Sequence, residues 1–180
     1  MEAIRALAGF EQRLLWHAVD GFASVRLEDL VPKEVPEMTP VIHHGKNSLP
    51  LFSHFEKRFY RGKSAETDSS QELYGCNFNS MMWIIGPGYY VAVNDPNRPE
   101  VLIDYRRLPS SKPDDWPKIQ TNEGCLSRFV YGFMVDTLRR VSEHVTIGSA
   151  ARHGKNMDNW FVLCREDSLS ISSYALPCVH

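Results

Sequence analysis

The chain has 180 residues, of which 43% are hydrophobic and 23% are charged, and this composition excludes wholesale disorder. A chain of this length can bury the core of one domain without disulfides or metal ions. Its 20 basic and 22 acidic residues leave a net charge of −2, which argues against nucleic acid as the main partner. We therefore expect one soluble domain that spans residues 1–180.

The sequence contains no signal for a membrane or a secretory route. No run approaches the roughly 20 apolar residues of a membrane helix, and the N-terminus lacks a basic leader with a long apolar run. We therefore expect a cytoplasmic protein with no membrane partner. The cysteines are widely spaced and include no Cys-x-x-Cys pair, so buried free thiols are expected, with two disulfides as the alternative. They are Cys76, Cys125, Cys164 and Cys178.

Residues 1–22 predict an amphipathic helix that Gly21 ends. Apolar residues recur there at helical spacing, with charged residues on the rest of the wheel. The apolar positions are Ile4, Leu7, Leu14, Leu15, Val19 and Phe22. We expect this stripe to cover part of the protein body.

Residues 24–72 predict an irregular segment that wraps the body, because prolines at this density forbid a continuous helix or a central strand. The prolines are Pro32, Pro36, Pro40 and Pro50. Ser48 predicts the N-cap of a short helix that carries Phe52, Phe55 and Phe59 on one side. Residues 168–180 predict a loosely held tail.

Residues 73–167 predict antiparallel strands that are separated by turns and by one polar loop at 109–124. The expected strands are 81–85, 89–93, 101–108, 129–135 with a continuation to 141, 145–151 and 160–165. Successive hairpins without crossover helices form a meander, and a long meander removes its edges by closing into a barrel. We therefore expect a mainly β fold, an antiparallel up-and-down barrel with an N-terminal helix. A β-sandwich or an α+β sheet without a cavity is the alternative.

Several predicted strands are apolar on both faces, whereas a one-sided sheet would alternate apolar with polar residues. In a barrel, one face lines the lumen and the other lies under the N-terminal helix and the proline-rich wrap. Such a lumen is suited to a small, largely apolar or aromatic molecule. The aromatic residues expected to contact this ligand are Trp83, Tyr90, Tyr131, Phe133 and Trp160.

Ionisable residues interrupt these apolar strands. Asp104, Tyr105 and Arg106 lie within one strand, and Asp136 lies near the end of another. Charges are costly to bury unless paired, so these residues either face solvent at the rim or form paired groups within a pocket. In a pocket, Asp104 or Asp136 would act as general base or acid, with Tyr105, Arg106 and His144 as stabilisers or proton partners.

The last predicted strands carry a recognisable run of short segments. They are Val130-Tyr131, Asp136-Thr137-Leu138-Arg139-Arg140-Val141, Val145-Thr146-Ile147-Gly148 and Phe161-Val162-Leu163-Cys164-Arg165. Together they resemble the closing strands of small lipocalin-like proteins of the GXWXG-containing type. Phe59-Tyr60-Arg61-Gly62-Lys63 is similar to the Gly-x-Trp-x-Gly-Lys element of that group, without its first glycine and its tryptophan. The resemblance implies a lipocalin-like barrel and a hydrophobic ligand, and it transfers no catalytic residue.

Motifs for cofactors and metals are missing from the sequence. It contains no Gly-x-Gly-x-x-Gly, no phosphate loop and no Gly-x-Ser-x-Gly. The adjacent His43 and His44 would point to opposite faces of a strand and could not easily share one ion. We therefore expect neither cofactor nor metal, and a monomer or homodimer.

The leading functional hypothesis is cofactor-free acid–base chemistry on a small apolar molecule, of the isomerase, cyclase or lyase type found in biosynthesis. A non-catalytic carrier of a hydrophobic ligand is the first alternative, because an apolar lumen alone is enough to hold such a ligand. A protein-interaction module is the second alternative and would show an exposed apolar patch without a cavity.

Overall fold

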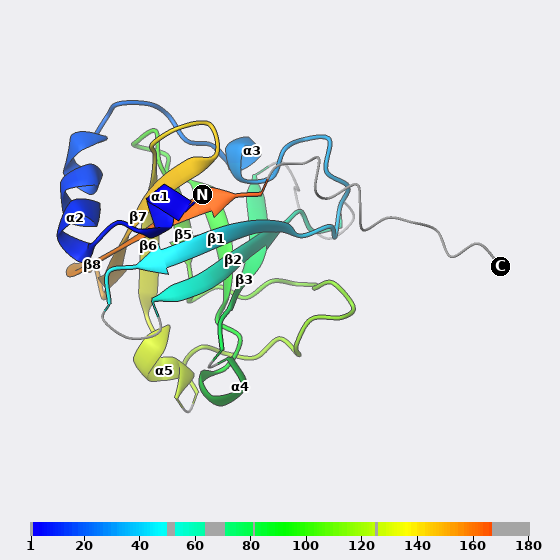
Figure 1. The fold of residues 1–180 in the computed structure, drawn as a ribbon. Coiled ribbons are helices and arrows are strands. Elements are labelled where there is room, and N and C mark those ends of the chain that lie inside the picture. The colour runs from blue at the N-terminus through cyan, green and yellow to red at the C-terminus, as the bar shows by residue number, and fades with distance from the viewer. Residues whose placement is uncertain (1, 50–52, 64–70, 81, 125, 167–180) are drawn as a thin grey trace.

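The protein is an eight-stranded antiparallel barrel in which each strand pairs with its neighbours in chain order and β8 closes onto β1 (Figure 1). The computed structural model describes residues 2–49, 53–63, 71–80, 82–124 and 126–166. The strands are β1 (Val41–Asn47), β2 (His54–Tyr60), β3 (Glu72–Phe78), β4 (Tyr89–Asn94), β5 (Val101–Asp104), β6 (Met134–Arg140), β7 (Val145–Arg152) and β8 (Lys155–Arg165). The prediction of an up-and-down barrel with an N-terminal helix is confirmed.

In the described parts of the chain, five short helices surround the barrel. They are α1 (Glu2–Arg5), α2 (Gly9–Ala18), α3 (Leu27–Leu30), α4 (Met82–Ile85) and α5 (Ser127–Val130). The strand predicted at 81–85 is wrong over its described residues, which form α4, and the strand predicted from 129 begins only at Met134, after α5. Short apolar runs fit a helical turn as well as a strand, so their periodicity does not separate the two.

The first two strands lie inside the segment that was expected to be irregular. The predicted short helix is wrong over His54–Tyr60, which forms β2, while Phe52 lies outside the described residues. Phe55 and Phe59 are four positions apart, a spacing that places them on one face of a helix or of a strand alike. In β2 they flank the inward-facing Lys57, while Glu56 and Arg58 form an ion pair on the outer face.

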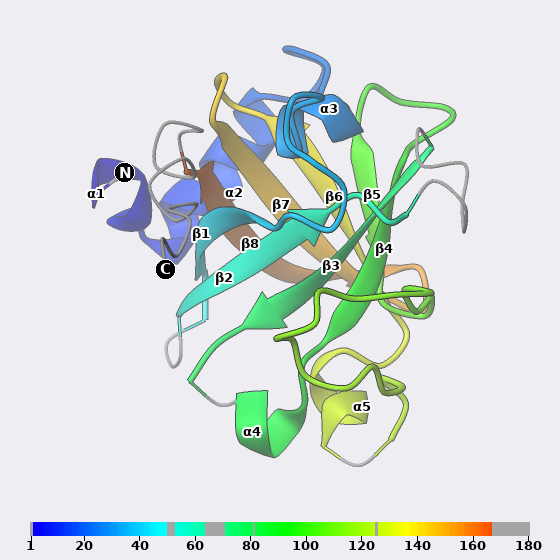
Figure 2. The ribbon, with the colours of Figure 1, turned by 90° about the vertical axis from the view of Figure 1, so that its right-hand side faces the viewer.

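The two ends of the barrel are closed by different parts of the chain. Figures 1 and 2 show α3 at one end and α4 and α5 at the other. The segment around α3 fills its end, because Val25, Leu30 and Val31 are buried in one cluster with the inward-facing Leu138 and Leu163. The proline-rich segment therefore plugs the barrel, in addition to wrapping it.

Arg61 holds this plug in place. Its guanidinium donates hydrogen bonds to the carbonyl oxygens of Val31 at 3.1 Å, Pro32 at 3.0 Å and Lys33 at 3.1 Å, and also to that of Val35. A guanidinium offers five N–H donors in a fixed plane and can satisfy several carbonyls of an irregular segment at once.

The outer face of the barrel is covered on one side by the region around α2 and on the other by the loop at 109–124. Trp16 and Val19, within and just after α2, pack against Ile147, Trp160 and Val162 of β7 and β8. The apolar stripe predicted for one continuous helix is wrong in part. Leu14 and Phe22 are exposed, because the helix is broken between α1 and α2 and α2 turns Trp16 inward instead.

The polar loop at 109–124 covers the other side of the barrel. The ring of Trp116 lies 5.2 Å from that of Tyr60 and 6.3 Å from that of Tyr89. Cys76 is buried in the same cluster and Cys164 is also buried, and both are free thiols. Cys125 and Cys178, like the predicted tail, lie outside the described residues.

Three glycines face aromatic rings across the strand ladder. Gly148 pairs with Phe161, Gly45 with Phe55 and Gly75 with Tyr90. A Cβ at Gly148 would lie 2.2 Å from the Phe161 ring, and the other two positions are similarly tight. Each ring therefore lies flat over the backbone of the neighbouring strand, an arrangement that shapes the inner wall.

Gly148→Ala is expected to lower the free energy of unfolding by about 1–3 kcal/mol, because the new methyl group displaces the Phe161 ring. Gly124→Ala is the control, since its Cβ would meet only the Thr121 methyl at 3.7 Å, and it should stay within about 0.5 kcal/mol. Urea unfolding measures both. Equal stability of the two variants would contradict this account of the wall.

His43 joins the plug to β1 and makes stability depend on pH. Its Nε2 lies 3.0 Å from the carbonyl oxygen of Leu30, which can only accept, so the ring donates to it. Burial lowers the pKa of His43 from 6.5 to about 3. The unfolded imidazole takes up a proton between these values and the folded one does not.

His43 should therefore stabilise the fold fully above pH 6.5 and lose up to about 4–5 kcal/mol of this stabilisation as the pH falls to about 3. His43→Gln keeps a neutral donor and should flatten the pH dependence of unfolding by about one proton. Unfolding by urea across this pH range checks the slope. Parallel slopes for wild type and variant would refute the assignment to His43.

Candidate functional site

A cavity of about 490 Å³ occupies the lumen at the end where α4 and α5 lie. Its wall is mainly apolar and is formed by strands and by these two helices. The apolar lining includes Phe55, Ile85, Phe129, Val130, Met134 and Phe161. The cavity and the plug divide the lumen into an open half and a filled half.

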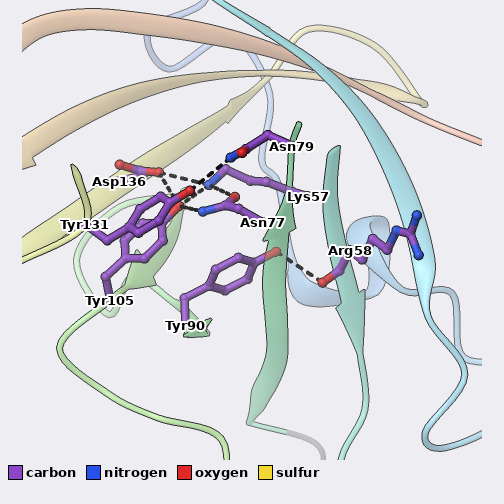
Figure 3. Close-up of polar contacts among 8 residues, drawn as sticks. All are labelled: Lys57, Arg58, Asn77, Asn79, Tyr90, Tyr105, Tyr131 and Asp136. Atoms are coloured by element: carbon purple, nitrogen blue, oxygen red, sulfur yellow. Dashed lines mark hydrogen bonds and ion pairs between the residues drawn. The ribbon is translucent and has the colours of Figure 1, made fainter. Parts of the chain in front are cut away.

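Four polar residues meet at the wall of this cavity, and we call them the lysine cluster: Lys57, Asn77, Tyr105 and Asp136 (Figure 3). The Lys57 ammonium lies 3.2 Å from Asp136 Oδ2 and 3.1 Å from Asn77 Oδ1, and it also donates to the Tyr105 hydroxyl. That hydroxyl accepts a bond of 2.9 Å from Asn77 Nδ2 and donates to Asp136 Oδ2 at 3.3 Å. Every member thus contacts at least two others.

The strand pleat brings the cluster together. Lys57 lies on β2, Asn77 on β3 and Asp136 on β6, each at an inward position. Tyr105 follows β5 directly. Its N–H donates to the Met134 carbonyl at 3.1 Å, and its own carbonyl accepts a bond of 2.8 Å from Asn122. Two anchors therefore fix the tyrosine at the end of its strand.

The ion pair is almost fully removed from water. Lys57 and Asp136 are each 2% exposed. Burial lowers the pKa of Lys57, against the Asp136 charge that raises it. Burial likewise raises the pKa of Asp136, against the Lys57 charge that lowers it. Burial thus favours the neutral form of each partner, while their mutual attraction favours the charged forms.

The tyrosines of the site remain protonated donors. Burial, followed by the nearby Asp136 charge, raises the pKa of Tyr105 well above its usual value. Burial raises the pKa of Tyr131 to about 12. The two rings are stacked with centroids 5.4 Å apart, and the Tyr131 hydroxyl accepts a 3.1 Å bond from Asn79. The Tyr131 hydroxyl, just after α5, and the Asn79 amide, just after β3, thus extend the polar wall.

One buried oxygen of the cluster has no partner. Asp136 Oδ1 makes no hydrogen bond within the described part of the chain, although Oδ2 is bonded to both Lys57 and Tyr105. An unpaired carboxylate oxygen in an apolar environment is costly. Asp136 is also a lining residue of the cavity, so the buried, half-partnered carboxylate lies next to the open volume.

Of the residues predicted from the sequence to act as acids or bases, some lie in the lysine cluster and others lie outside it. Asp136 and Tyr105 come together in the lysine cluster. Asp104 faces outward and forms an ion pair of 2.7 Å with the exposed Arg106. Burial raises the pKa of Asp104, but the hydrogen bonds and charge of Arg106 outweigh this effect and lower it. His144 lies in the turn between β6 and β7, where its Nδ1 accepts a 2.9 Å bond from Arg165.

The predicted ligand contacts are also divided. Tyr131 lines the cavity, as does Trp160, whose side chain packs in the cluster beneath α2. Tyr90 is buried, and its hydroxyl donates to the Arg58 carbonyl at 3.2 Å (Figure 3). Phe133 stacks on His153 with centroids 4.6 Å apart, and Trp83 on α4 is 85% exposed. Neither Phe133 nor Trp83 belongs to the cavity wall.

Sequence reasoning missed Lys57 and Asn77. Lys57 lay in a segment interpreted as a helix, and Asn77 carried no motif. One signal was present: a lysine between two phenylalanines at alternate positions, Phe55 and Phe59, matches an inward strand face that includes a charge. That pattern would have predicted a buried cation with a partner elsewhere in the chain.

No known family matches the sequence, and a search of curated proteins finds no match. None of the described helices is long and apolar enough to cross a membrane. Across the described ranges, no three His, Cys, Asp or Glu side chains are grouped to hold a metal ion. Assignment of function therefore depends on the geometry of the cavity.

Lys57→Met is expected to destabilise the protein by about 3–5 kcal/mol at neutral pH, because it leaves the Asp136 carboxylate buried without a cation. The deficit should shrink as the pH falls toward about 4, because burial raises the pKa of Asp136 in the folded state, so the folded carboxyl takes up its proton before the unfolded one, which does so only near its usual pKa of about 4. Adding Asp136→Leu should recover most of the loss, since no unpaired charge remains. Urea unfolding over this pH range measures each step.

Lys33→Met is the matched control. Lys33 forms a 3.0 Å pair with Glu28, but both side chains are more than 60% exposed, so the loss should be about 0–1 kcal/mol. A similar loss in both lysine variants would mean that the Lys57–Asp136 pair is no more important than a surface pair.

Proposed function

We propose that the protein binds a small, neutral, largely apolar molecule in the barrel cavity and moves a proton on it without a cofactor. The reaction would be of the isomerase, cyclase or lyase type found in small-molecule biosynthesis. The observation that carries the proposal is the buried Asp136 carboxylate, which belongs to a lining residue of an apolar cavity and has one oxygen without a partner in the described part of the chain.

The charge balance of the cluster favours a neutral ligand. Lys57 and Asp136 already neutralise each other at 3.2 Å. An anionic ligand would face Asp136 and a cationic one would face Lys57, and either would bury an extra charge without a partner. A molecule with an apolar body and one carbonyl or hydroxyl group satisfies both the wall and the cluster.

The paired charges of Lys57 and Asp136 also support proton transfer. If Asp136 removes a proton from carbon next to a carbonyl, the negative charge moves from the carboxylate to the ligand's oxygen. The Lys57 ammonium and the Tyr105 hydroxyl lie beside that carboxylate and can stabilise the new oxyanion. One anion replaces another next to the same cation, so the net charge of the site stays constant during the reaction.

Burial gives Asp136 the basicity that this step requires. Desolvation raises its pKa, and a carboxylate whose pKa is raised toward neutrality is a better general base than an exposed one. The apolar wall also keeps competing water from the reacting atoms. A carrier of an apolar ligand would gain nothing from such a buried pair, which is why the catalytic alternative is preferred.

The test uses 2-acetonaphthone, a neutral aromatic methyl ketone, as probe. We expect it to raise the Tm of the protein, because a ligand that binds only the folded state stabilises it. In deuterated buffer the protein should speed the exchange of its methyl protons, as followed by NMR. Asp136→Asn should slow the catalysed exchange by about 10²–10⁴-fold.

Asp115→Asn is the control, since Asp115 is exposed and away from the cavity lining. Binding without exchange in the wild type would favour the carrier. Loss of exchange in Asp104→Asn rather than in Asp136→Asn would show that the wrong carboxylate has been chosen.

A further inference from the structure

Lys57 presents an amino group to the cavity, and the proposed proton transfer uses it only as a cation. Lys57 is the only buried lysine among the described residues, since the other lysines of these ranges are exposed or half-buried. Its Nζ belongs to a side chain that lines the cavity wall. An amine in this position could form a bond to a carbon atom of a ligand, in addition to stabilising a negative charge on it.

The surroundings of Lys57 act on its charge in two opposite ways: desolvation favours the neutral amine, whereas the nearby ring faces and the Asp136 carboxylate favour the ammonium. Four aromatic rings lie around Nζ, with centroids at 4.9 Å for Tyr105, 5.0 Å for Phe161, 5.1 Å for Tyr90 and 5.8 Å for Phe55. Burial among them lowers the pKa of the ammonium. A desolvated lysine in an apolar pocket is a typical amine nucleophile toward carbonyl compounds.

We propose that Lys57 forms a covalent imine with a neutral aldehyde or ketone bound in the cavity. The inference deepens the proposed function, because it uses the same cavity and names carbonyl compounds as the ligand class. The proton comes from within the cluster: transfer from Lys57 to Asp136, whose Oδ2 lies 3.2 Å away, yields a neutral amine and a neutral carboxylic acid.

The reaction balances with these two groups alone. The amine nitrogen forms a bond to the carbonyl carbon while the Asp136 carboxyl gives its proton to the carbonyl oxygen. The carboxylate then takes one proton from nitrogen and passes it to the hydroxyl, which leaves as water as the carbon–nitrogen double bond forms. The products are a protonated imine on Lys57, an Asp136 carboxylate and one molecule of water.

The product restores the charges of the resting site. The protonated imine replaces the ammonium, and Asp136 is again a carboxylate. The site therefore contains an ion pair both before and after the reaction. Tyr105, which bonds to both Lys57 and Asp136, can hold the carbonyl oxygen during the addition. No buried charge is left unpaired at either end of the reaction.

The experiment traps the imine with cinnamaldehyde and sodium cyanoborohydride at neutral pH. Reduction converts an imine into a stable secondary amine, which peptide mapping by mass spectrometry assigns to a lysine. We expect Lys57 to be modified about tenfold faster or more than Lys118 and Lys155, which are exposed, because a larger share of it is unprotonated.

Lys57→Arg keeps the positive charge and removes the nucleophile, so it should abolish the fast adduct, whereas Lys155→Arg should leave it unchanged. If Lys57→Arg does not fold, the mapping of the wild type still decides. Modification of the exposed lysines with Lys57 untouched would overturn the proposal. Exchange of 2-acetonaphthone protons without a Lys57 adduct would refute the imine alone, and an adduct without exchange would refute only the proton transfer.

Discussion

The ion pair between Lys57 and Asp136 crosses the lumen of the barrel, and the site is organised around it. The two residues are 79 positions apart in the chain. In the closed ring of eight strands, β2 and β6 stand opposite each other, with three strands between them on either side. Side chains from opposite walls can meet only because the lumen is narrow and because β8 closes onto β1. Without that closure both charges would be solvated and would have no reason to pair.

The division of the lumen determines what the pair can do. Val25, Leu30 and Val31 fill one half, and Arg61 holds the backbone at Val31 and Pro32 in place. The other half is left as the cavity. The ion pair lies at the boundary between the apolar packing and the cavity, so it is desolvated although both of its residues line the open volume. A plug in both halves would make the pair purely structural, and an open lumen would expose it to water and return both pKa values to their usual range.

Acid–base and covalent chemistry draw on the same physical state of this pair. Burial pushes both groups toward neutrality while their mutual attraction keeps them charged. A small change in the surroundings, such as the arrival of a carbonyl oxygen, can therefore shift the proton from one to the other. As an ion pair the site offers a base and a cation, and as a neutral pair it offers an acid and a nucleophile. In the proposed chemistry, the position of the ligand in the cavity would decide which form reacts.

The sequence by itself determined the broad architecture. Apolar strands separated by turns between residues 89 and 165 favoured a meander, and a long meander tends to close to satisfy its edges. The strands β1 and β2 were not predicted, and the run at 81–85 was wrongly predicted as a strand over its described residues. The sequence also indicated that Asp136 and Tyr105 are ionisable residues in apolar surroundings. It did not reveal that Lys57 joins them, because residues 54–60 fit a helix and a strand equally well and because the partner is remote in the chain.

Only the tertiary structure decided which ionisable residues face the lumen. Asp104 and Tyr105 are adjacent, and both lie in or next to a strand that is apolar on both faces. No local feature of the sequence therefore decides which of the two side chains points into the lumen. The pairing of β5 with β4 and β6 decides this, turning Ile103 and Tyr105 inward and Asp104 outward to Arg106. A shift of one residue would exchange them. The register is a property of the closed barrel, since it depends on pairings and burial that residues 101–105 alone do not contain.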